Sequence, residues 1–279
     1  MSDYADRVTE TPDPADPPPE QTESAKASVD RAPRAGKKRS AFQEGAILVG
    51  IAVVLYYVML TFVARPYLIP SESLEPTLHG CKGCVGDRIM VDKITYRFGT
   101  PQPGDVIVFK GPPNWNVGYK SIRSDNAVLR GLQNALSFVG FVPPDENDLV
   151  KRVIAVGGQT VQCRADTGLT VDGKPLKQPF LDPTTMMADP VVYPCLGNEF
   201  GPVAIPEGRL WVMGDNRTHS ADSRAHCAST PVEAQKGVLC TGDPDAGTIP
   251  VDNVIGKAQF IAWPPSRWGG VSSFDPQQG

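Results

Sequence analysis

The sequence predicts a mainly β protein that is held to a membrane by one N-terminal helix. A run of 19 residues without charge, from Ala46 to Ala64, predicts the helix. The 27 glycines and 28 prolines among 279 residues are typical of short strands with frequent turns. Short runs of β-branched residues recur from residue 88 to residue 263, and 41% hydrophobic content is enough for a real core.

Residues 1–45 have the composition of a disordered cytoplasmic tail. Residues 1–30 carry eight acidic and two basic side chains, and five of the eight residues from Pro12 to Pro19 are proline. Such a segment buries too little apolar surface to offset its ordering entropy. The tail ends in a basic juxtamembrane cluster, residues 31–39, with five Lys or Arg and no acid. Because the net charge is -4 and no second basic cluster follows, we expect no nucleic-acid partner.

Residues 46–64 are expected to cross a membrane. A helix of 19 residues is about 28 Å long, close to the roughly 30 Å of a bilayer core. A buried core helix or a cleaved signal peptide are alternatives, but the run is long for a signal peptide and begins some 45 residues into the chain. Five cations precede it and only Arg65 directly follows, so we expect a single-pass plasma-membrane protein with its N-terminus in the cytoplasm and residues 65–279 outside.

All six cysteines follow the predicted membrane helix. An even number of cysteines in an oxidising compartment indicates disulfides. Sequence alone does not choose among the pairings, and our guess by order is 81–84, 163–195 and 227–240. Zinc is a rival for Cys81-x-x-Cys84, but no second close pair completes four ligands, so we expect neither a metal nor a cofactor.

The segment after the helix predicts a series of strands. Ser71 and Ser73 stand two apart, which in a strand would place both side chains on one face. Residues 88–98 and 104–110 are predicted to be paired strands, and further strands are expected at 149–164, at 169–176 with a turn at Asp172-Gly173, before residue 214, and at 254–263. Residues 177–209 are expected to be rich in loops.

Residues 111–148 interrupt the strands and form a predicted insertion. Val128, Leu129, Leu132 and Leu136 recur at helical spacing, which predicts one amphipathic helix. We favour a helix that packs on the protein body. A helix that lies in the membrane interface is the alternative.

Lys151 is the most informative single residue, because it stands inside the apolar run of residues 149–158. A lysine there either extends its amine to water or serves chemistry. Lysine can accept the proton of a serine hydroxyl only when it is uncharged, and burial lowers its pKa toward that state. Arg152 would point to the opposite face of the strand and is interpreted as a structural cation.

Four separated segments resemble bacterial type I signal peptidases, in an actinobacterial-like form. They are residues 70–78, 86–98, 149–158 and 214–224, and the last, GDNRTHSADSR, is the most specific. The resemblance implies a coiled antiparallel β-sheet of the signal-peptidase/LexA-like type. It also implies a membrane-anchored Ser/Lys endopeptidase that removes signal peptides from exported preproteins after Ala-x-Ala. Signal peptides and membrane lipid are the implied partners, and the translocation machinery is a further candidate.

The resemblance also assigns roles to residues of this chain. Ser73 becomes the nucleophile and Lys151 its general base. The supporting groups are Ser71 in the oxyanion hole, Ser220 orienting the lysine, and Asp222 and Arg224 behind them, while the substrate pockets are lined by Ile69, Leu74, Leu78 and Val150. Leu74 replaces the usual Met, and Gly157-Gly158-Gln159 replaces the usual Pro-Gly-Asp after the base.

Other functions fit less well. A Ser-His-Asp hydrolase would need His79, His219 or His226 with Ser73, but the sequence has no G-x-S-x-G motif. A penicillin-binding enzyme needs S-x-x-K, which is also missing. A catalytically inactive binding module of the same fold is the remaining alternative, and the presence of both Ser73 and Lys151 argues against it.

Overall fold

The computed structural model describes residues 40–81, 84–115, 123–138, 148–182, 195–227, 238–240 and 243–278. The predicted tail, apart from residues 40–45, lies outside them. Helix α1, Ala41–Val58, continues as a π-helical turn, η1, Met59–Val63. Together they form one apolar helix of 23 residues with mean hydropathy 2.6, long enough to cross a membrane.

The helix begins five residues before the predicted apolar run, and a capping box explains why. The backbone N–H of Gln43 donates to Ser40 Oγ at 3.2 Å, and the backbone N–H of Ser40 donates to Gln43 Oε1 at 3.2 Å. This reciprocal pair satisfies N–H groups that a helix start otherwise leaves unbonded.

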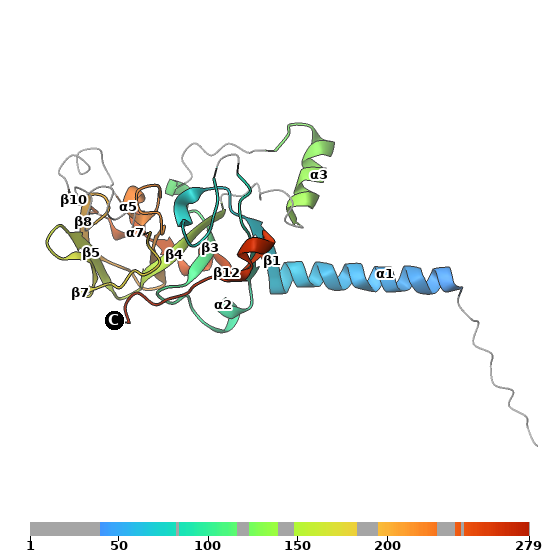
Figure 1. Cartoon of the computed structure of the whole chain (residues 1–279), viewed down its shortest axis with the longest axis horizontal. Helices are drawn as coiled ribbons and strands as arrows, with labels where there is room; N and C mark the ends of the chain where they lie inside the picture. The colour runs from blue at the N-terminus through green and yellow to red at the C-terminus, as the bar shows by residue number, and fades with distance from the viewer. Residues whose placement is uncertain are drawn as a thin grey trace, which may run out of the picture. The chain divides into compact units, whose positions relative to one another are not determined.

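The larger sheet has eight strands, and two of the four segments on which the resemblance rests, residues 86–98 and 149–158, contribute β2 and β4 to it (Figure 1). Its order is β1-β2-β12-β3-β4-β9-β11, every pair is antiparallel, and β13 pairs with β12. The strands are β1 Ala64–Leu68, β2 Arg88–Asp92, β3 Val106–Lys110, β4 Asp148–Val156, β9 Arg209–Met213, β11 Ile249–Pro250, β12 Val254–Trp263 and β13 Gly269–Gly270.

A second sheet of five strands follows the order β10-β8-β5-β6-β7. Its strands are β5 Thr160–Arg164, β6 Gly168–Val171, β7 Lys174–Pro175, β8 Glu199–Ala204 and β10 Val238–Leu239. Its pairs are antiparallel except β10 with β8, which is parallel. The predicted turn between β6 and β7 is present, with positive φ at both Asp172 and Gly173, as tight hairpins require. The mainly β, antiparallel fold class is therefore confirmed.

Two strand predictions were wrong. Residues 88–98 do not form one strand, because Asp92 Oδ1 accepts the backbone N–H of Ile94 at 2.7 Å and starts a helical turn, α2, Thr95–Phe98. β2 and β3 are also not paired with each other, since β12 from the C-terminal end of the chain lies between them. Residues 177–209 were expected to be rich in loops, and the described part of this range also contains β8, a strand that was not predicted because Gly201 and Pro202 interrupt its apolar pattern.

Short helices join the strands, and one longer helix lies in the predicted insertion. The short ones are η2 Glu72–Leu74, η3 Pro113–Trp115, α5 Ser223–His226, α7 Pro244–Gly247, η4 Val251–Asn253 and η5 Pro265–Arg267. The longer one is α3, Ala127–Phe138, as its apolar spacing predicts. Its residues Val128, Leu129 and Leu132 are 81%, 51% and 56% exposed, so the favoured expectation that this face packs on the body was wrong.

The three predicted disulfides are present, pairing Cys81 with Cys84, Cys163 with Cys195, and Cys227 with Cys240. Cys163 and Cys195 are buried in an apolar cluster between the second sheet and β9, where Phe200 stacks on Trp211 with centroids 5.3 Å apart. This pair therefore joins β5 to the chain that precedes β8, inside the core.

Replacing both Cys163 and Cys195 with alanine is expected to lower the free energy of unfolding by about 2–4 kcal/mol, because the unfolded chain gains entropy. Chemical denaturation of the folded domain measures the change. Replacing Cys81 and Cys84, which close a loop only three residues apart, is the control and should cost less. Equal losses from the two double variants would contradict the expected role of the buried bridge.

Candidate active site

The nucleophile predicted by the resemblance lies in a tight turn and touches the predicted base. Ser73 belongs to η2, not to a strand, and is 7% exposed. Lys151 lies on β4, is 4% exposed, and its Nζ donates to Ser73 Oγ at 2.7 Å. Ser71 Oγ is 3.3 Å from Ser73 Oγ. The fold therefore brings together three of the predicted site residues, two of them 78 positions apart.

The turn that carries Ser73 is held from behind by the loop after β9. The backbone N–H of Asn216 donates to the carbonyl of Ser73 at 3.2 Å. Gly214 has no room for a side chain, because a Cβ there would collide with that carbonyl and with Ser220 Oγ. A glycine at this position is thus required for the close approach of the two loops.

Lys151 is buried in a way that favours its uncharged form. Burial lowers its pKa from 10.5 to about 8, because the ammonium loses its hydration. The negative charges of Asp222 and Asp215 partly oppose this shift, and the positive charge of Arg224 assists it. Near pH 8 a substantial fraction of this amine can therefore accept a proton.

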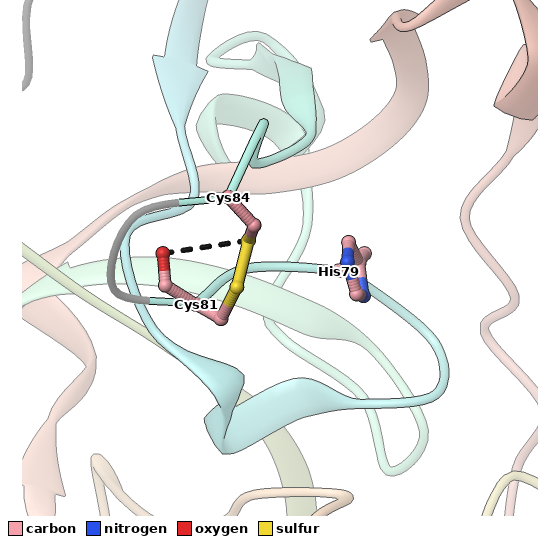
Figure 2. A group of neighbouring side chains, drawn as sticks. All are labelled: His79, Cys81 and Cys84. Carbon is pink, nitrogen blue, oxygen red and sulfur yellow. Dashed lines mark hydrogen bonds between the residues drawn. A yellow bond between two sulfur atoms is a disulfide. The ribbon is translucent and has the colours of Figure 1, made fainter.

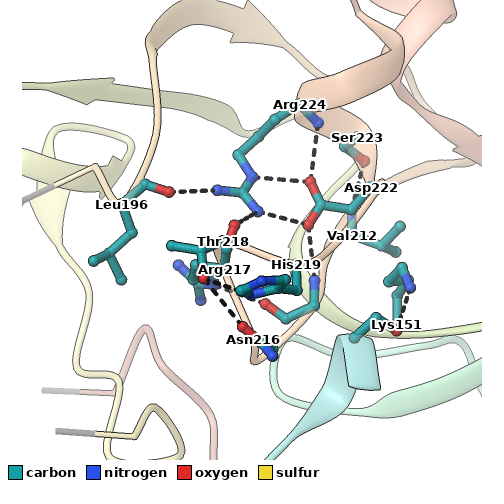
Figure 3. A network of polar contacts seen from close by, with 12 residues as sticks. Lys151, Leu196, Val212, Asn216, Arg217, Thr218, His219, Asp222, Ser223 and Arg224 are labelled. Carbon is teal, nitrogen blue, oxygen red and sulfur yellow. Dashed lines mark hydrogen bonds and ion pairs between the residues drawn. The ribbon is translucent and has the colours of Figure 1, made fainter. Parts of the chain in front are cut away.

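Asp222 and Arg224 form a buried pair next to the lysine (Figure 3). Asp222 caps α5 and accepts hydrogen bonds from the backbone N–H of Gly214 at 3.0 Å and from Arg224 Nε at 2.9 Å and Nη2 at 2.8 Å. Burial alone would raise the pKa of Asp222, but the charge and hydrogen bonds of Arg224 hold it below its ordinary value. The pair therefore stays ionised and fastens the loop of Gly214 to α5.

Ser220 does not make the contact that the resemblance implies. Its Oγ is buried, and within the described residues it makes no hydrogen bond to Lys151. The lysine amine is directed to Ser73 instead, and Ser220 Oγ lies against Gly214. An orienting role for Ser220 stays a prediction.

The four predicted pocket residues lie in or against one apolar cluster. Ile69, Leu74 and Leu78 belong to it and are 3%, 1% and 0% exposed, and Val150 packs against it. Side chains that are this deeply buried have almost no surface left with which to contact a substrate directly. Their role as substrate contacts remains an expectation.

Arg152 occupies the opposite face of β4, as the strand alternation predicts. It is fully buried and pairs with Asp215 through two hydrogen bonds, Nε to Oδ1 at 2.9 Å and Nη2 to Oδ2 at 2.7 Å. Thr77, four residues after the nucleophile, donates to the same carboxylate at 2.6 Å. Sequence reasoning missed this network, although Asp215 stands in the most specific segment.

The loop that follows the nucleophile contains possible metal ligands (Figure 2). His79, Cys81 and Cys84 place ligand atoms within 4.8 Å of one another. The two sulfur atoms are joined in a disulfide, however, and zinc binds thiolates. His79 Nδ1 lies 2.8 Å from Glu75 Oε1. In this oxidised form the loop is a disulfide-closed turn.

Comparisons with known proteins agree with this geometry. The family model described as signal peptidase, peptidase S26, matches residues 42–263. A signal peptidase I of Mycobacterium tuberculosis (strain CDC 1551 / Oshkosh) is 74% identical over 91% of this chain and 83% of its own length. A probable signal peptidase I of Mycobacterium leprae (strain TN) is 77% identical over 87% and 83%, and a signal peptidase I of Bacillus licheniformis is 34% identical over 82% and 91%. With its β fold, apolar N-terminal helix and paired Ser73 and Lys151, the chain belongs to the S26 family of signal peptidases.

Proposed function

We propose that this membrane-anchored serine endopeptidase removes signal peptides from preproteins by means of Ser73 and Lys151 as nucleophile and general base. The observation that carries the assignment is the 2.7 Å contact between Lys151 Nζ and Ser73 Oγ, two groups that are both buried. A lysine whose pKa is about 8 can serve as a base near neutral pH, which an exposed lysine cannot.

The chemistry follows from these positions. Uncharged Lys151 accepts the hydroxyl proton of Ser73 while Oγ bonds to the scissile carbonyl carbon. The backbone N–H of Ser73 and the hydroxyl of Ser71 stabilise the negative charge that develops on the carbonyl oxygen. Protonated Lys151 then donates to the leaving amine, which departs as the new N-terminus of the mature protein. Water, activated by the same amine, cleaves the acyl-enzyme and restores Ser73.

The proposed orientation places this chemistry outside the cytoplasmic membrane. Five cations lie before the apolar helix within residues 31–39, and the positive-inside rule assigns that side to the cytoplasm. The three disulfides, all beyond the helix, support the same assignment, because they persist in oxidising compartments. Lipid and the translocation machinery are the proposed partners on that side.

The proposed specificity for Ala-x-Ala rests on the apolar floor under the nucleophile. Leu74 and Leu78 are buried in the cluster next to Ser73, and we infer that they form the base of a shallow site that favours small side chains next to the scissile bond. Cleavage of a preprotein in detergent by the full-length enzyme tests the function. Substrates with Ala or with Leu before the cut should differ by at least ~10-fold in kcat/KM. Cleavage of neither substrate would favour the alternative of an inactive binding module.

Replacing Ser71 with alanine is expected to lower kcat roughly 10- to 100-fold with little change in KM. The hydroxyl would stabilise charge that exists only in the transition state, and the backbone donor would remain. Steady-state kinetics with a peptide substrate measure the effect, and Ser71→Thr, which keeps the hydroxyl, is the matched control. A change confined to KM would show that Ser71 only binds the substrate.

A further inference from the structure

A pocket of about 340 Å³ lies beside the loop that backs the nucleophile. Its lining includes Arg217, Thr218 and Ser220 from that loop, Arg224 and Ala225 from α5, and the backbone near Leu196. The lining contains neither Ser73 nor Lys151, and Figure 3 draws Arg217 and Lys151 on opposite sides of Asp222. None of the steps proposed for signal peptide cleavage uses it.

The charges behind this pocket do not balance. Arg152 pairs with Asp215, and Arg224 pairs with Asp222. Arg217 is 4% exposed, and no ion pair to it is formed within the part of the chain that the structure describes. The three guanidinium groups and two carboxylates thus leave one buried positive charge in excess. The guanidinium of Arg217 lies 6.0 Å from the centroid of the Phe180 ring, and the charges of Asp215 and Asp222 act on it from a distance. A buried charge that no carboxylate contacts directly is costly, so this group calls for an explanation.

One buried polar atom of the pocket lining, Arg217 Nη2, lacks a hydrogen-bond partner among the described residues. Ser220 Oγ meets no strict hydrogen-bond geometry either, but its hydroxyl faces Asp222 and helps to hold the pKa of that carboxyl below its ordinary value. The two arginines that line the pocket use their other nitrogen atoms differently. Arg217 Nε donates to the carbonyl of Gly214 at 2.9 Å, whereas Arg224 uses its nitrogens on Asp222 and on the carbonyls of Arg217 and Leu196. Arg217 is therefore the arginine of this pocket that still has an unused N–H donor.

We propose that this pocket binds a compact anion, with Arg217 as the principal contact and Arg224 adding positive charge. Guanidinium groups suit oxyanions because their N–H groups form charge-assisted hydrogen bonds to several oxygens. Bound there, the anion neutralises the excess charge. Burial and the nearby charge of Arg224 lower the pKa of Arg217 to about 9, which is the signature of a crowded, poorly solvated cation that an anion would relieve.

Inorganic phosphate is the probe for the test, with chloride at matched ionic strength as the comparison. Calorimetric titration of the full-length protein in detergent should find one saturable site. Phosphate at ten times its Kd should raise the melting temperature by roughly 3–6 °C. Arg217→Gln should abolish both effects. Arg130→Gln, which removes an exposed arginine on α3, is the matched control and should keep them.

A second pair of variants keeps the test decisive if Arg217→Gln does not fold. Ala225 is exposed and lines the pocket, so Ala225→Glu would place a tethered carboxylate beside the arginines, whereas Ala225→Gln has nearly the same shape without the charge. Ala225→Glu should melt higher than Ala225→Gln and should no longer respond to phosphate. A phosphate response that is unchanged in both variants, or that is also unchanged in Arg217→Gln, would overturn the site, as would a wild-type response equal for phosphate and chloride at all concentrations.

Discussion

Replacing Ser73 with alanine, or Lys151 with methionine, is expected to lower the rate of preprotein cleavage by roughly 10⁴-fold or more, and the double variant should be no slower than either single one. The reason is geometric. The hydroxyl loses its only described base when the amine is removed, and the amine has no proton to accept when the hydroxyl is removed. Methionine fills the volume of the buried lysine, so that the loss reports on chemistry more than on packing.

Two exposed residues supply matched controls for this prediction. Ser273→Ala and Lys174→Met change the same residue types at exposed positions and should leave the rate unchanged. Thermal melts of all variants separate lost activity from lost folding. Should Lys151→Met retain more than a few per cent of the activity while Ser73→Ala abolishes it, another base would be required.

Local features of the fold could be predicted because their causes are local. The apolar runs, the Asp172-Gly173 turn and the alternation that separates Lys151 from Arg152 all depend on residues within a few positions of one another. The place of β12 between β2 and β3 could not be predicted in this way, because it pairs residues that lie 145 to 175 positions apart in the sequence. Alternation says which face a strand residue occupies but not which strand lies beside it.

The candidate site was predictable to the same extent. The resemblance named Ser73, Lys151, Asp222 and Arg224, and the structure brings them together. It did not reveal that Arg152 would pair with Asp215. A buried arginine can pair with any carboxylate that folding brings next to it, and Asp215 is 63 positions away in the sequence. The unpaired Nη2 group of Arg217 could not be predicted for the same reason, since only the folded structure shows which side-chain atoms lack a hydrogen-bond partner.

The pH dependence of cleavage should report the burial of Lys151. Its pKa of about 8 predicts an acidic limb centred there, on which kcat/KM falls about tenfold per pH unit, or roughly 10³-fold between pH 8 and pH 5. The partly buried His226, stacked on Trp115 with centroids 4.3 Å apart, is the control, because desolvation lowers its pKa from the ordinary value of 6.5. The acidic limb of the pH profile of kcat/KM should therefore be unchanged in His226→Gln.

The same shift in the Lys151 pKa sets the sign of its contribution to stability. The folded protein has the lower pKa, about 8 against 10.5, so between these values the unfolded chain binds more protons and the free energy of unfolding rises with pH. Below pH 8 both states are protonated, and further acidification costs activity without additional loss of stability from this group. Lys151→Met should flatten the pH dependence of stability between pH 8 and 10.5, as measured by denaturant unfolding, while Lys174→Met should not. An acidic limb near the pKa of free lysine, or an acidic limb that disappears in His226→Gln, would remove Lys151 from the role of tuned base.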